Sequence, residues 1–164
     1  MLPQVTLCTP AHRTSLEHLL DRYRLRVAHV AASTPIPGSY WGDSEAGLVE
    51  GTLYLRDDTP LHSALHEACH YICMDDARRA SLNTDAGGDD AEENAVCYLQ
   101  GLLADAIAGY DRATLFADMD RWGYSFRLGS AQAWFHEDAD DAQAWLLQHH
   151  LIDADNRVTG TLRN

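Results

Sequence analysis

The residues His66-Glu-Ala-Cys-His70 combine two imidazoles and a carboxylate at a spacing that suits metal chemistry. On a helix, His66 and His70 lie one turn apart on the same face, so their ring nitrogens can share one ion. Imidazole nitrogen is a common zinc ligand, and two such ligands on one helix are preorganised for a tetrahedral site. Glu67 lies beside them, where it can act as a general base toward a water that the metal acidifies. This spacing is that of metalloprotease helices.

A chance origin of the motif has to be weighed, because the chain holds nine histidines and 25 acidic residues. The surroundings favour a site, since apolar residues flank the motif on both sides. Burying two histidines and a glutamate in such a setting costs free energy unless they have a partner. We therefore expect a zinc site at His66 and His70, and a relic motif is the alternative.

The third ligand has to come from another part of the chain, because a catalytic zinc site usually has three protein ligands and one open position. A second, antiparallel helix beginning near Ala91 would return its first turn to the histidines. Glu92 lies on the apolar stripe of that helix, whereas Glu93 is turned by about 100°. We predict Glu92 as the third ligand, and the alternatives are Glu93, Asp89 and Asp90.

Other side chains could assist or compete at this site. Cys69 and Cys73 share the helix of the motif, but they lack the C-x-x-C spacing of structural zinc sites, so we expect reduced, buried, apolar side chains. Stabilising a developing oxyanion takes a further hydrogen-bond donor. The candidates are Tyr40, Tyr124 and His136.

The elements that position these residues are a small early sheet and several helices, which predicts an α+β fold. We expect strands at residues 26–31, 46–49 and 52–56, the last two forming a hairpin through Glu50-Gly51. We expect helices at residues 15–24, 59–74, 91–109 and 111–121, with one or two more in 130–150. Ser15 and Thr59-Pro60 are the expected starts of the first two helices. The stretch 122–126 either borders the cleft as a strand or packs in the core.

Composition limits the class of protein. A chain of 164 residues with 46% hydrophobic residues fits a single folded domain spanning residues 1–164. The formal charge of -13 disfavours direct nucleic-acid binding and anionic membranes. No apolar run is long enough to span a membrane, and residues 1–10 lack a signal-peptide pattern, so we expect a cytoplasmic protein. The sequence does not predict an oligomeric state.

The combined pattern resembles the ImmA/IrrE-type metallopeptidases. That family pairs HExxH with a later helix that opens on a Glu-Ala-Asn-like stretch, whose glutamate is the third zinc ligand. Aligning the asparagine with Asn94 places this ligand at Glu92. The resemblance covers about residues 15–105, and residues 111–164 form a helical C-terminal extension without a counterpart in the family.

The resemblance implies a zincin-like, gluzincin-like fold that hydrolyses a peptide bond in an intracellular protein, with a transcriptional regulator as one class of partner. Glu67 would be the general base. The chain lacks a helix-turn-helix pattern and shows Leu102-Leu103-Ala104-Asp105 where the family has a Leu-Leu-Met-Pro-like ending, which leaves the substrate open. The alternative is a non-catalytic zincin-like domain that binds and sequesters a regulator. A hydrolase of small amides would need a closed pocket, whereas a peptidase needs an open cleft with a free strand edge.

Overall fold

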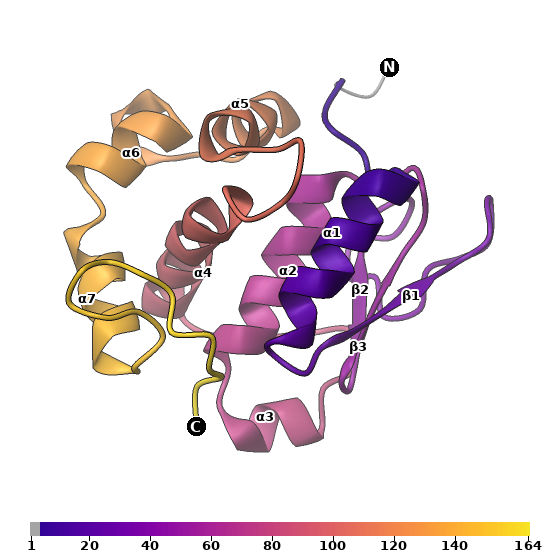
Figure 1. The fold of residues 1–164 in the computed structure, drawn as a ribbon, viewed down its shortest axis with the longest axis horizontal. Helices are drawn as coiled ribbons and strands as arrows, with labels where there is room; N and C mark the ends of the chain where they lie inside the picture. The colour runs from indigo at the N-terminus through magenta and orange to yellow at the C-terminus, as the bar shows by residue number, and fades with distance from the viewer. Residues whose placement is uncertain (1–3) are drawn as a thin grey trace.

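The computed structural model describes residues 4–164 and confirms the α+β class. Figure 1 shows the layers: the sheet, then α2, then α4, then the C-terminal helices. The helices are α1 (Pro10–Asp21), α2 (Leu61–Cys73), α3 (Asp76–Ala80), α4 (Asp90–Ala104), α5 (Arg112–Trp122), α6 (Ala131–Glu137) and α7 (Asp140–Gln148). The strands are β1 (Arg26–His29), β2 (Gly47–Val49) and β3 (Thr52–Leu55), and a short 3-10 turn, η1, spans Arg127–Gly129. Within residues 4–164, no helix is both long and apolar enough to cross a membrane.

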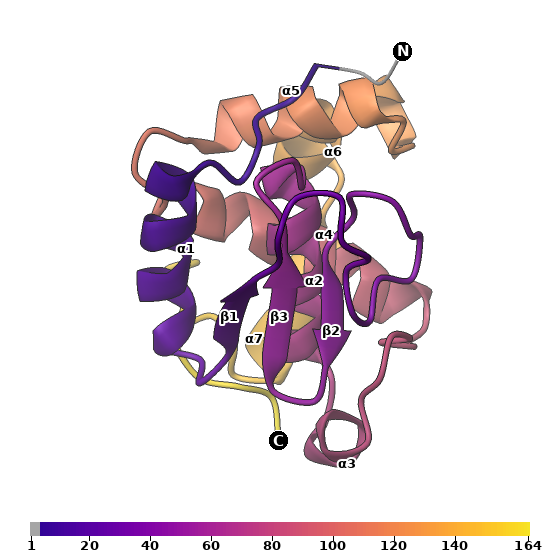
Figure 2. The ribbon, with the colours of Figure 1, turned by 90° about the vertical axis from the view of Figure 1, so that its right-hand side faces the viewer.

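The sheet has the strand order β1-β3-β2 and packs on one face of α2 (Figure 2). The hairpin of β2 and β3 is antiparallel, as predicted. The parallel pairing of β1 with β3 was not expected from the sequence. The outer edge of β2 is covered by the segment after α3, because Thr84 N donates to Leu48 O (2.9 Å) and Glu50 N donates to Leu82 O (2.7 Å).

Helix α2 is the centre of the molecule, and all of its residues except Glu67 are buried. A helix that is buried on nearly every side needs neighbours on every side, and here the sheet and α4 provide most of them. The helix begins at Leu61, one residue after Pro60, the predicted first helical position. The Thr59 hydroxyl accepts from Arg56 N (2.9 Å) instead of capping the helix.

Helix α4 packs against α2 on one side and against α5 and α7 on the other. Gly101 permits the close approach of the C-terminal helices, since a Cβ there would lie 2.9 Å from the Phe135 ring and 3.0 Å from the Phe116 ring. The helix ends at Ala104 rather than at the predicted residue 109. Tighter turns continue the chain to Gly109, whose φ of +76° reverses it.

Two further elements differ from the sequence prediction. Helix α1 begins at Pro10, which suits the first turn of a helix, and Ser15 lies inside it. The Ser15 hydroxyl accepts from Ala108 N (2.9 Å). Helix α3 was not predicted, because five residues are too few to show a periodicity. The Asp75 carboxylate caps it by accepting from Arg78 N (2.9 Å).

His62 is fully buried in α2 and packs edge-on against Trp122 and Tyr124, with ring centroids 5.1 and 5.6 Å away. Neither of its ring nitrogens has a hydrogen-bond partner among the described residues. Burial, reinforced by nearby His66, lowers the pKa of His62 to about 3. The ring is therefore neutral in the folded protein at pH 7.

We predict that His62 makes the protein less stable as the pH falls from about 6.5 toward 3. The unfolded imidazole, with a pKa of about 6.5, binds a proton in this window that the folded state does not bind. Each pH unit then costs at most about 1.4 kcal/mol of unfolding free energy. Urea unfolding of the metal-free protein should show a shallower loss in His62→Phe than in the parent. The change His136→Phe on the exposed face of α6 should keep the parent's slope, and equal slopes in all three would contradict the prediction.

Candidate metal centre

His66 and His70 both direct Nε2 at the carboxylate of Glu93. The distance from His66 Nε2 to Oε1 is 3.0 Å and that from His70 Nε2 to Oε2 is 3.1 Å. One ligand atom from each of these three residues lies within 4.8 Å of the others, so the group could hold a metal ion. Ligand bonds of about 2.0–2.2 Å place the ligand atoms of a tetrahedral site about 3.3–3.6 Å apart, so separations of up to 4.8 Å here would have to close by roughly an ångström around an ion.

A buried amide orients His66. Gln100 Nε2 donates to the His62 carbonyl (2.8 Å), so its oxygen faces His66 and accepts from Nδ1 (3.0 Å). This contact occupies Nδ1, so Nε2 is the ring nitrogen that can bind a metal in place of its contact with Glu93. Sequence reasoning missed Gln100. The signal was a polar residue two helical turns after Glu93 in an otherwise apolar stretch.

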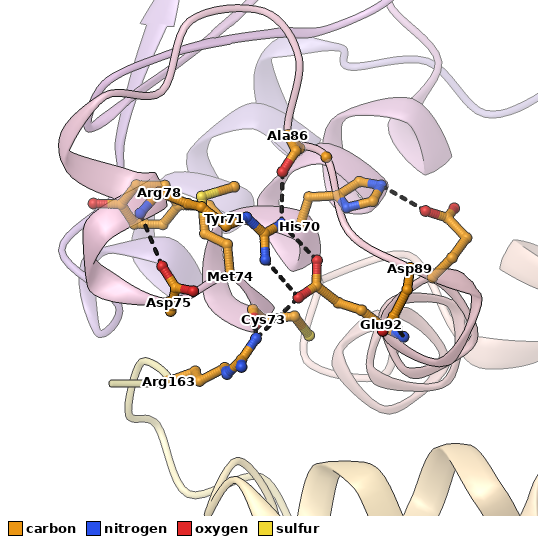
Figure 3. A network of polar contacts seen from close by, with 12 residues as sticks. His70, Tyr71, Cys73, Met74, Asp75, Arg78, Ala86, Asp89, Glu92 and Arg163 are labelled. Carbon is orange, nitrogen blue, oxygen red and sulfur yellow. Dashed lines mark hydrogen bonds and ion pairs between the residues drawn. The ribbon is translucent and has the colours of Figure 1, made fainter.

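Glu92, the residue predicted as the third ligand, points away from the histidines. Its Oε1 accepts from Arg78 (2.8 Å) and Arg163 (3.0 Å), and its Oε2 accepts from Arg78 (2.7 Å), as Figure 3 shows. The structure thus corrects the assignment: Glu93, the alternative, lies beside His66 and His70. The helical stripe correctly placed Glu92 in the interior. However, the metal group, formed by His66, His70 and Glu93, lies at the solvent edge of the contact between α2 and α4. Glu93 reaches it because Glu93 is turned by about 100° from Glu92 around the helix.

The arginines that bind Glu92 tie several segments to the start of α4 (Figure 3). Arg78, from α3, also donates to the carbonyl of Ala86 (2.6 Å). Arg163, from the C-terminal segment, also donates to the carbonyl of Cys73 at the end of α2 (3.1 Å). Glu92 therefore fixes the first turn of α4, and with it the direction in which Glu93 points.

The remaining candidate ligands lie outside the group. Asp89 is the N-cap of α4 and accepts from Glu92 N (2.9 Å), and Asp90 is exposed in the first turn. Cys69 and Cys73 are free and fully buried, as expected. Burial raises the pKa of both thiols, which keeps them protonated.

The pKa values of the two carboxyl groups nearest the histidines are shifted in opposite directions. Burial raises the pKa of Glu67 above its ordinary value. Burial also acts to raise the pKa of Glu93, but hydrogen bonds from His66 and His70 outweigh it and lower that pKa. Glu93 is thus suited to be an anionic ligand, while Glu67 is free of these contacts and faces the adjoining hollows.

The metal group lies where two surface hollows meet. Both hollows are lined by Trp41, His66, Glu67 and Glu93. The smaller, of about 250 Å³, continues along Tyr40, His70 and residues 84–87. The larger, of about 430 Å³, continues along Glu45, Ser63, Trp122, Gly123 and Tyr124. The site is therefore an open cleft with space on both sides of the metal group.

The candidate oxyanion donors differ in their position relative to the cleft. Tyr124 lines the larger hollow, and its ring packs edge-on against that of His66 at 5.6 Å. Burial raises the pKa of Tyr124 to about 12, so its hydroxyl keeps its proton. Tyr40 lines the smaller hollow at its rim, and His136 is exposed on α6 and lines neither. The stretch 122–126 borders the cleft as the end of α5 and a loop, not as a strand.

Comparisons of the chain with protein-family models, with curated proteins and with solved structures found no match. The geometry of the site is therefore the main basis for assigning a function.

We predict that two adjacent glutamates have separable roles. Glu93→Gln should lose Co²⁺ binding, because it removes the anionic ligand, while its stability changes little. Glu92→Gln should still bind Co²⁺, because the amide oxygen can keep an arginine contact that holds the first turn of α4, but it should lose about 1–3 kcal/mol of unfolding free energy. That loss is smaller than the roughly 3–5 kcal/mol for a fully buried pair, because both arginines are partly exposed. Visible absorption of bound Co²⁺ and urea unfolding measure the two effects, and Co²⁺ loss in Glu92→Gln with retention in Glu93→Gln would reverse the assignment.

Proposed function

We propose that the protein is a zinc-dependent peptidase with a zincin-like active site, in which His66, His70 and Glu93 hold the metal. The observation that carries this proposal is the convergence of both Nε2 atoms on the Glu93 carboxylate, with Glu67 lining the same cleft. The resemblance of the HExxH helix and the following glutamate helix to the ImmA/IrrE-type metallopeptidases supports it.

The donor set favours zinc. Two imidazoles and one carboxylate are the ligands of a large class of catalytic zinc sites, in which a fourth position stays open. The same set also binds iron(II) in oxygenases. Glu67 favours hydrolysis, because a carboxylate beside the ligands that is not itself a ligand supplies the base that water activation requires.

Each side chain of this cleft has a separate role in the proposed hydrolysis. Bound zinc would lower the pKa of a water at its open position. Glu67 takes a proton from the attacking water and delivers it to the leaving amine nitrogen. The Tyr124 hydroxyl donates a hydrogen bond to the carbonyl oxygen as negative charge develops there. Gln100 holds Nδ1 of His66 by a hydrogen bond, so Nε2 is the ring nitrogen that would bind the metal.

The shape of the cleft favours a polypeptide over a small amide. Two hollows on either side of the metal group leave room for residues on both sides of a scissile bond. Residues 82–84 cover the edge of β2, so the free strand edge expected of a peptidase is not found at β2. Residues 84–87 line the smaller hollow in its place. An intracellular regulatory protein is the substrate class that the resemblance supports.

The rival function is sequestration of a regulator without cleavage. A binding domain needs the shape of the cleft but has no need for a base beside the metal. Glu67 therefore decides between the two functions, and its replacement is the direct test.

We predict that Glu67→Gln keeps about one zinc per chain but loses hydrolysis of a quenched fluorescent peptide library by about 10²–10⁴-fold. The variant retains the size of the side chain and removes only its ability to accept a proton. Asp85→Asn, which removes a charge from the smaller hollow, should keep hydrolysis within a few-fold of the parent. A Glu67→Gln protein as active as the parent would contradict the mechanism, and a zinc-loaded parent with no hydrolysis at all would favour sequestration.

We predict that Tyr124→Phe lowers kcat by about 10–100-fold with little change in KM. Removing one oxyanion donor typically costs about 10²–10³-fold in kcat, and a bound metal would share this role, so a smaller loss is expected. Tyr40→Phe is the matched control, because it removes a hydroxyl from the rim of the same cleft and should leave kcat nearly unchanged. Steady-state kinetics of the zinc-loaded proteins measure both, and an unchanged kcat in Tyr124→Phe would remove this residue from the mechanism.

A further inference from the structure

The larger hollow contains a carboxylate that the proposed reaction does not use. Glu45 Oε1 accepts a hydrogen bond from Trp122 Nε1 (2.9 Å), and its Oε2 accepts one from the Ser63 hydroxyl. Ser63 is buried in α2, and its oxygen also accepts from Ala46 N (3.0 Å). The carboxylate is therefore held in one orientation at the wall of the hollow by the ends of two helices.

The charge of Glu45 is not cancelled by these contacts. Its two partners, an indole N–H and a hydroxyl, are neutral donors. Among the described residues that line the two hollows there is no arginine or lysine. Glu45 is therefore an anion of the larger hollow without an arginine or lysine partner.

Aromatic rings surround this anion. Trp41, Trp122 and Tyr124 line the larger hollow with Glu45. Trp41 is 76% exposed, and its indole packs edge-on against Tyr40, with ring centroids 5.0 Å apart. Large aromatic side chains left in water beside a pocket commonly mark a binding surface, because they gain most from being covered. This observation is independent of the acidic groups.

A hollow with a fixed anion and indole walls suits one kind of side chain. A guanidinium is planar, stacks on indole faces and donates paired hydrogen bonds to a carboxylate. An ammonium also pairs with the anion but stacks less well. The volume of about 430 Å³ lies within the range of small-ligand sites.

We infer that the larger hollow is the side-chain subsite of the proposed peptidase and that it selects a basic residue of the substrate, arginine over lysine. This inference rests on the proposed function for the meaning of the subsite, while the binding preference itself does not require catalysis. The formal charge of -13 on the chain would further attract basic peptides toward the cleft.

The two hydrogen bonds of Glu45 connect its loop to α2 and α5, so a test substitution should disturb them as little as possible. Glu45→Gln keeps the size of the side chain and an oxygen that can accept from Trp122, and it removes the charge. Asp43→Asn is the matched control, since Asp43 lies on the same loop, is exposed and lines neither hollow. Both variants change the net charge by one.

The test uses zinc-loaded Glu67→Gln protein, which would bind without cleaving, titrated calorimetrically with acetyl-Ala-Ala-Xaa-Ala-Ala-amide peptides. Xaa is arginine, lysine, norleucine or citrulline, the last being the neutral isostere of arginine. We expect the arginine peptide to bind about tenfold more tightly than the citrulline peptide, with lysine between them. The added change Glu45→Gln should reduce the preference to less than about twofold, and the added change Asp43→Asn should preserve it.

The inference would be overturned by no binding of the arginine peptide, by no preference over citrulline, or by a preference that Glu45→Gln retains. An equal loss in the Asp43→Asn control would also overturn it, since it would show a general charge effect. Cleavage by the parent protein separates the two proposals. Selective binding without cleavage would contradict the proposed peptidase activity and support the arginine subsite. Cleavage without a preference for arginine would support the peptidase activity and contradict the subsite.

Discussion

The ion pairs of the buried Glu92 carboxylate with Arg78 and Arg163 are the constraint on which the candidate site depends. They join the first turn of α4 to α3, to the loop before α4 and to the C-terminal segment. A buried charge network of this kind is weak evidence for stability, because desolvation offsets much of the attraction. The effect of this network is to orient α4. It fixes the rotation of the helix about its axis, and that rotation places Glu93 opposite the two histidines.

The acidic residues around the cleft differ in function because they differ in partners. Glu92 is bound by arginines and is structural, and Glu93 is bound by His66 and His70 and is the candidate ligand. Glu67 faces the cleft as the proposed base. Glu45 is held by neutral donors and keeps its charge for a substrate. The position of each carboxylate relative to cations therefore determines its proposed role more than its burial does.

Much of the fold and part of the site could be predicted from local sequence patterns. The hairpin of β2 and β3, the helix of the motif and the following helix were predicted, because alternation, periodicity and turn residues act over short distances. The choice between Glu92 and Glu93 could not be settled in this way. Helical periodicity places Glu92 inside, but its partner Arg163 lies 71 residues away, and no local pattern brings the two together.

Other parts of the site also depend on long-range packing. Gln100 reaches His66 across the contact between α2 and α4, and Trp122 reaches Glu45 from the end of α5. The C-terminal extension, for which the sequence predicted no role, supplies Arg163 to the Glu92 network and thus contributes to the geometry of the site. Such contributions become visible only when the chain is folded.

X-ray absorption spectroscopy of the zinc-loaded protein tests the central claim most directly, because it reports the atoms bound to the metal. A site formed by His66, His70 and Glu93 should give only nitrogen and oxygen neighbours at about 2.0–2.2 Å, with the outer-shell scattering of two imidazoles. A sulfur neighbour at about 2.3 Å would show that a buried cysteine holds the metal. That result, or a spectrum without imidazole scattering, would contradict the assignment of His66, His70 and Glu93.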